Sequence, residues 1–130
     1  FSGTHNFASG GDSFKIALYT GSIASVYTTS STVVSATNEV STGGSSNYSR
    51  KILGSQAVAS STAVASVDFG DSTWSSATFT AAFAAIYNDD QGDKLCVVLD
   101  FGGDKTCTNG TFKITYPDPA TPANAIISMS

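Results

Sequence analysis

The sequence predicts one all-β domain spanning residues 1–130, a single-domain antiparallel β-sandwich for which jelly-roll connections are one option. Its apolar residues fall into short alternating runs rather than into helical stripes. Turn-forming residues separate these runs at intervals of about eight to twelve residues, the spacing typical of sandwiches. Ser and Thr together make up more than a quarter of the chain. These features predict a sheet protein with a polar surface and one economical core.

The first half of the chain contains two predicted strands and one long polar stretch. Phe14–Tyr19 alternates between two faces, which predicts a half-buried strand. Residues 21–46 are dominated by Ser, Thr and Gly, and they predict either short strands or a long ordered loop. Residues 48–53 predict a second short strand, which the chain enters through a pair of glycines.

The middle of the chain contains two further predicted strands. Residues 63–69 form the first, and a turn after it leads to the only Trp, Trp74. Residues 78–87 form the second, although their alanines also favour a helix. We predict a strand, because the aromatic residues recur at steps of two or four and threonines occupy the opposite face.

The last part of the chain predicts three more strands. Residues 88–93 are a polar connection of hairpin length. Residues 95–101 are apolar on both faces, which is typical of a central strand covered on both sides. Residues 111–116 alternate cleanly, and residues 125–129 form a final strand after three prolines.

The charge of the chain argues against two classes of partner. Its net charge is −4, and only Arg50 and Lys51 are adjacent basic residues, so it lacks the basic patch of a nucleic-acid-binding protein. No apolar stretch approaches the length needed to span a bilayer. The sequence therefore predicts neither a nucleic-acid partner nor a membrane partner.

Residues capable of catalysis or of metal binding are few and scattered. His5 is the only histidine and Glu39 the only glutamate, and no G-x-S-x-G motif surrounds a serine. We therefore predict that the protein is not an enzyme, with no catalytic, cofactor-binding or metal-binding residue and no cofactor. The aspartates Asp89, Asp90 and Asp93 are interpreted as a solvated hairpin tip, with an irregular calcium site as the alternative.

The cysteines and the tryptophan each leave two interpretations open. Cys96 and Cys107 are interpreted as thiols, with Cys96 a small core residue, and a disulfide is the alternative. Trp74 is interpreted as a core or edge-covering residue, and the alternative is a platform on which a sugar ring stacks.

Several segments resemble a family of small virion structural proteins of tailed bacteriophages. The resemblance covers nearly the whole chain in consistent order. The segments that carry it are FKIALYT (14–20), ATNEVSTGG (36–44) leading into YSR (48–50), VDFGDSTWSSATFTA (67–81), AAIYN (84–88) and VLDFGGDKTCTNGTFKITYP (98–117).

The resemblance implies a capsid decoration (cement) protein, which binds the outer surface of the major capsid protein lattice and stabilises the head. It implies a homo-oligomer, with a trimer expected, assembled in the host cytoplasm and located on the outer capsid surface of the virion. Two alternatives remain: a tail or fibre-associated virion component, and a carbohydrate-binding adhesive module, for which an exposed row of aromatic residues around Trp74 would be the distinguishing feature.

Two segments are the predicted contact surfaces. The first is an N-terminal arm, residues 1–13, which carries Phe1, His5 and Phe7 and which we expect to contact the partner. The second is the Ser/Thr-rich segment, residues 28–46. Within it, Glu39 is expected to pair with Arg50 and so to orient this segment.

Overall fold

The computed structural model describes residues 10–28, 30–54, 57–61, 64–115 and 126–129. Nearly all regular structure in these residues is β, which confirms the predicted all-β class. The helices among them are single 3-10 turns, and none is long or apolar enough to cross a membrane. The strands are β1 (Phe14–Tyr19), β2 (Lys51–Leu53), β3 (Ala57–Ser61), β4 (Val64–Asp68), β5 (Ser72–Asn88), β6 (Lys94–Thr115) and β7 (Ile126–Met129), and the 3-10 turns are η1 (Ile23–Ser25), η2 (Gly44–Ser46) and η3 (Asp89–Gln91).

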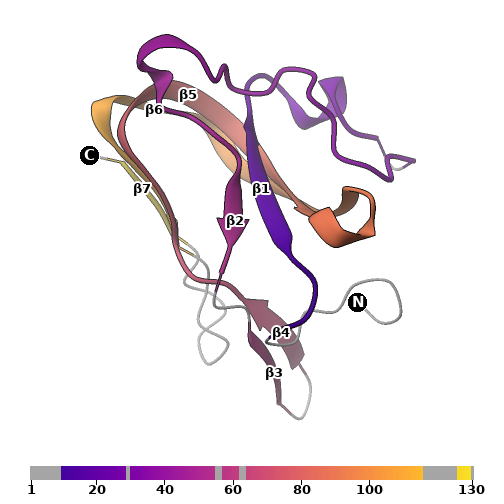
Figure 1. Cartoon of the computed structure of the whole chain (residues 1–130). Helices are drawn as coiled ribbons and strands as arrows, with labels where there is room; N and C mark the ends of the chain where they lie inside the picture. The colour runs from indigo at the N-terminus through magenta and orange to yellow at the C-terminus, as the bar shows by residue number, and fades with distance from the viewer. Residues whose placement is uncertain (1–9, 29, 55–56, 62–63, 116–125, 130) are drawn as a thin grey trace.

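The described strands form one five-stranded sheet and one separate hairpin. The order in the sheet is β2-β1-β5-β6-β7, and each neighbouring pair is antiparallel. The strand β1 therefore lies between β2 and β5, although β5 follows it only after a long stretch of chain. The hairpin β3-β4 projects at the lower end of the molecule in Figure 1. The β-sandwich with jelly-roll connections stays a prediction.

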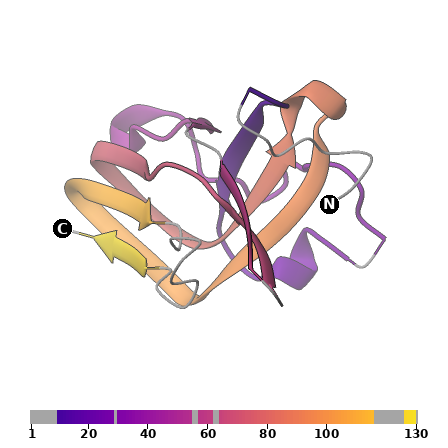
Figure 2. The same cartoon turned by 90° about the horizontal axis from the view of Figure 1, so that it is seen from below.

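The long hairpin of β5 and β6 is sharply bent. Its register shifts between Trp74 and Ala77 and again between Ala81 and Phe83. Gly102 and Gly103 have φ values of 75° and 144°, which glycine adopts without a steric penalty, and they lie where β6 turns a corner. Figure 2 shows β6 changing direction along its length, so that its last segment lies beside β7.

The core fills the inside of this bend. Alternate residues of β1 point inward, and Phe14, Ile16 and Leu18 are fully buried against the aromatic side chains of the bent hairpin. On the opposite face of β1, Ala17 and Tyr19 are buried as well, under residues of the loop that connects β1 to β2. The sheet is therefore covered on both faces around β1, and β1 is held between two apolar clusters.

The structure confirms most of the predicted strands. Phe14–Tyr19 is a strand with the predicted bounds, and residues 78–87 are a strand rather than a helix, within the longer β5. The short strand predicted for residues 48–53 is confirmed, although β2 begins only at Lys51. Residues 21–28 and 30–46 form the ordered loop, with the turns η1 and η2, rather than the short strands. The sequence analysis missed β3, whose Ala- and Ser-rich sequence carries little strand signal.

One strand differs from its prediction. Residues 95–101 pair with β5, yet none of residues 95–100 is buried, and Val97 is 42% exposed. The cover expected on both sides of this segment is therefore only partial: Cys96 and Leu99 pack against one apolar cluster and Leu95 and Val98 against the other, yet none of them is buried. The physical reason is its position, because the described strand beyond it, β7, pairs only with Phe112–Thr115 at the far end of β6.

Candidate functional site

The predicted pair of Glu39 and Arg50 is present. Arg50 donates from Nε to Glu39 Oε1 and from an Nη atom to Glu39 Oε2, each at 2.8 Å. This two-pronged geometry uses both oxygens of the carboxylate and fixes the guanidinium plane. The side chain of Glu39 is 14% exposed and that of Arg50 is 30% exposed, so the pair is shielded from solvent more than a typical surface ion pair.

The backbone around Glu39 is tied to the end of β1. Thr20 N donates to Asn38 O and Val40 N donates to Leu18 O, both at 2.9 Å. Tyr19 and Glu39 face one another in an isolated antiparallel bridge. Because β2 pairs only with the first half of β1, this short stretch continues the same edge of the sheet. The Ser/Thr-rich segment is therefore fastened where its glutamate lies.

Two tyrosines complete the network around the ion pair. Tyr48 accepts a hydrogen bond from Leu18 N at 3.0 Å and donates its own to Glu39 Oε1 at 2.7 Å. Tyr87 accepts from Arg50 at 3.2 Å, and the guanidinium carbon lies 5.3 Å from the centre of its ring. The sequence analysis did not identify either tyrosine. The available signal was that Tyr48 and Arg50 are two residues apart in a predicted strand and so share a face.

The titration of these groups favours a permanent ion pair. Burial alone raises the pKa of Glu39, but the hydrogen bonds from Arg50 and Tyr48 outweigh it and hold the pKa below its ordinary value of 4.5. The bond to Glu39 raises the pKa of Arg50, and burial raises the pKa of the Tyr48 phenol. At neutral pH Glu39 is therefore ionised, and Arg50 and Tyr48 are protonated.

A second set of hydrogen bonds fastens the Ser/Thr-rich segment at Ser35. Tyr27 donates to the hydroxyl of Tyr19 at 2.7 Å, and Tyr19 donates to Ser35 O at 2.6 Å. Ser35 N in turn donates to the hydroxyl of Tyr27 at 2.9 Å. The ring of Tyr19 also stacks on Phe83 of β5 at a centroid distance of 5.0 Å. The segment is thus held to the sheet by buried aromatic side chains at more than one point.

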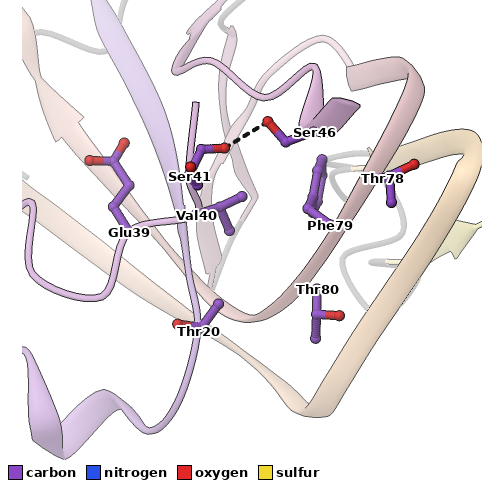
Figure 3. A pocket seen from close by; sticks show the side chains of 8 residues that line it. All are labelled: Thr20, Glu39, Val40, Ser41, Ser46, Thr78, Phe79 and Thr80. Carbon is purple, nitrogen blue, oxygen red and sulfur yellow. Dashed lines mark hydrogen bonds between the residues drawn. The ribbon is translucent and has the colours of Figure 1, made fainter. Parts of the chain in front are cut away.

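A hollow lies between the Ser/Thr-rich segment and β5. Its volume is about 370 Å³ and it is open to solvent. Figure 3 shows Val40 and Phe79 facing one another, with hydroxyl groups around them and Glu39 at one side. Ser46 donates to Ser41 O at 2.7 Å along the rim. We call this the hydroxyl-lined hollow; its lining residues are Thr20, Glu39, Val40, Ser41, Ser46, Thr78, Phe79 and Thr80.

Two aspartates of the hairpin tip between β5 and β6 contact β1 and the residue before it. Asp89 lies 3.1 Å from Lys15 Nζ in an ion pair. Asp90 accepts from Ser13 N at 2.8 Å, and its own N–H donates to Asn88. Among the described residues no group of three or more His, Cys, Asp or Glu side chains is placed to hold a metal ion. These contacts agree with the interpretation of residues 88–93 as a hairpin connection.

Trp74 is a core residue. It is 1% exposed, and its Nε1 donates to Ser49 O at 2.8 Å. The aromatic rings around it, Tyr48, Phe79 and Phe112, are buried too. In the part of the chain that the structure describes, the exposed aromatic row that would distinguish a sugar-binding module is therefore not formed around Trp74.

Cys96 and Cys107 form no disulfide, in agreement with their interpretation as thiols. Cys107 is buried and Cys96 is half-buried. Burial raises the pKa of the Cys96 thiol to about 11, with a further contribution from the negative charge of Asp12. Cys96 is therefore protonated at neutral pH and is a poor nucleophile.

The remaining predicted contact residues, Phe1, His5 and Phe7, lie outside the described residues, as does most of the predicted arm. The structure thus brings together two of the five predicted contact residues, Glu39 and Arg50. Comparison of the chain with protein-family models, with curated proteins and with solved structures found no match.

Proposed function

We propose that this protein is a non-enzymatic decoration protein of a bacteriophage head, which binds the outer surface of the major capsid protein lattice and stabilises the shell. The proposal starts from the resemblance of its segments to small tailed-phage virion proteins. It places the protein in the virion, as a homo-oligomer on the outer capsid surface that assembles in the host cytoplasm.

The observation that carries the proposal is the way the Ser/Thr-rich segment is held. Buried tyrosines and the pair of Glu39 and Arg50 fix this segment against the sheet. A segment fixed before binding loses little conformational entropy when a partner docks. Fastening a long polar segment so firmly suits a protein that works by presenting a surface.

The hydroxyl-lined hollow supplies a surface of the kind that such a protein needs. Its Ser and Thr hydroxyls can each donate or accept a hydrogen bond, so they adapt to the backbone of a protein loop. Val40 and Phe79 add an apolar floor of limited exposed area. We propose that a loop of the capsid protein docks here.

The test measures binding to phage heads that lack a decoration protein. The wild-type protein is expected to bind in hundreds of copies per head and to raise the temperature at which the heads rupture. Ser41→Arg places a long side chain at the rim of the hollow, at an exposed position, and is expected to lower head affinity at least about tenfold. Gln91→Arg, an equally charged change at the exposed hairpin tip, is the control and is expected to bind normally.

Three outcomes would contradict the proposal. Wild-type protein that does not bind heads would remove it. A count of only a few copies per particle would favour a neck, tail or fibre position. Specific binding of the isolated protein to an array of glycans, with no binding to heads, would favour the adhesive alternative.

A further inference from the structure

The first half of β6 has the sequence of a central strand and the surroundings of an edge strand. Residues 95–99 are all apolar, a pattern typical of strands covered on both faces. Each of them is nevertheless partly exposed, and Val97 is 42% exposed. Its antiparallel partner on β5, Ile86, is 3% exposed. The two strands share a register and a face, so the difference lies in what flanks them.

One flank of this segment is open in the described part of the chain. On the side away from β5, the start of β6 is bonded to the Ser/Thr-rich segment, where Leu95 N donates to Thr32 O and Val34 N donates to Asp93 O, both at 3.0 Å. Beyond that point no described strand pairs with residues 97–101 on this side. Figure 2 shows this stretch of β6 running along the outside of the sheet, well before it reaches β7.

The charges around the open flank indicate what could cover it. Lys94 precedes the apolar run, whereas Asp100 and Asp104 lie at and after its end, and all three are exposed. An antiparallel neighbour of the same sequence therefore places its acidic end beside Lys94 and its basic end beside the aspartates. Apolar residues then face apolar residues along the middle. The segment is complementary to a second copy of itself, as a two-fold symmetric interface requires.

The geometry points to a symmetric dimer in which residues 97–101 of two copies of this chain pair as antiparallel edge strands. The pairing joins the two five-stranded sheets into one continuous sheet and covers Val97 on both chains. It satisfies backbone groups that an edge strand leaves to solvent. This interface is independent of the hydroxyl-lined hollow and of capsid binding.

The other edge of the sheet is a poor competitor and a useful control. The edge strand β2 has only three residues, and its exposed apolar residue is Ile52, 70% exposed. Arg50 and Lys51 stand together at its start. A short basic edge of this kind resists pairing with itself.

The test is the mass of the full-length protein in solution. Wild-type protein is expected to be a dimer by sedimentation equilibrium over a series from about 1 to about 100 µM. Val97→Lys puts a charge into the paired segment, opposite the apolar end of the other copy, and is expected to weaken the dimer at least about a hundredfold, to a monomer. Ile52→Lys, the same change at a more exposed position on the other edge, is expected to leave the dimer intact. Circular dichroism and thermal unfolding verify that both variants fold.

A charge exchange tests the proposed direction of pairing. Lys94→Asp is expected to weaken the dimer about three- to tenfold, and adding Asp104→Lys in the same chain is expected to restore most of the affinity. Wild-type protein that is monomeric throughout the series, or trimeric, would overturn the proposal. Equal effects of Val97→Lys and Ile52→Lys would do the same. A monomeric wild type whose head binding is abolished by Val97→Lys would assign this edge to a capsid strand instead.

Discussion

The neighbouring strands β5 and β6 show how differently two apolar runs are used in one sheet. Residues 81–88 of β5 are all buried, whereas none of residues 95–100 of β6 is. The two segments pair with each other, so they share the same local geometry. The difference is that β5 has β1 on its second flank, whereas no described strand pairs with residues 95–100 of β6 on theirs, because β7 pairs only with Phe112–Thr115. Burial in a sheet is therefore decided by the neighbour as much as by the side chain.

The largest expected effect is a cavity on the buried side of this comparison. Ile86→Ala removes most of a side chain that is 3% exposed and packed in the main core, so we expect a loss of about 3 kcal/mol in the free energy of unfolding. Urea denaturation measures it. A loss below about 1 kcal/mol would mean that β5 is less tightly enclosed than its burial indicates.

The second prediction concerns Arg50, which links the Ser/Thr-rich segment to β5 through Glu39 and Tyr87. Arg50→Met leaves the Glu39 carboxylate without its main partner while preserving the length of the side chain, and we expect a loss of about 2 kcal/mol. The control is Lys113→Met, which breaks an ion pair with Asp71 whose side chains are 39% and 42% exposed. That change is expected to cost about 0.5 kcal/mol or less. Equal losses in the two variants would argue against a special role for the Glu39 network.

The same network predicts a pH dependence of stability. The pKa of Glu39 is lower in the folded protein than its ordinary value of 4.5, so its ionised form favours folding. This contribution is complete above about pH 4.5 and is lost as the pH falls through the folded pKa. Glu39→Gln removes it, so the difference in unfolding free energy between wild type and variant should shrink as the pH falls through the folded pKa. A difference that is constant with pH would show that the carboxylate charge does not stabilise the fold.

The smallest expected effect lies on the open side of the comparison. Val97→Ala, measured at a concentration where the protein is monomeric, is expected to cost about 0.5 kcal/mol, because the side chain is already 42% exposed. The difference between this loss and that of Ile86→Ala, at the residue paired with Val97, then shows how much a neighbouring strand on the second flank contributes to stability. A loss as large as that of Ile86→Ala would mean that Val97 is enclosed in the monomer.

Local patterns in the sequence were sufficient for most of the fold. Alternation identified β1, and the spacing of aromatic residues identified β5 as a strand in spite of its alanines. The predicted pairing of Glu39 with Arg50 followed from the scarcity of charged partners, since the chain has a single glutamate. The two strands could be predicted because their patterns involve residues near in sequence. The ion pair could be predicted because the chain offers few charged partners.

Other features depend on which segments meet, and periodicity does not contain that information. The apolar run of β6 predicted cover on both sides because its residues fit a central strand, but among the described strands β7 pairs only with the far end of β6 and leaves this run without a neighbour on one flank. Tyr87 joins the Glu39 network because β5 pairs with β1, and this pairing brings the end of β5 beside Arg50. Long-range pairing of this kind is fixed by the topology of the sheet, which a single sequence specifies weakly.

The pairing of β1 with β5 has a consequence for how the chain folds. The hairpin of β5 and β6 joins residues that are close in sequence, and its tip, with Gly92 in the left-handed region, forms without a long loop closure. Pairing Phe14 with Asn88 instead requires the intervening chain to be gathered first. Such distant contacts make barriers high, so we expect the hairpin to form early and β1 to insert late, in a reaction on the millisecond-to-second scale. Newly made chains would then expose the apolar flank of β5 until that insertion is complete.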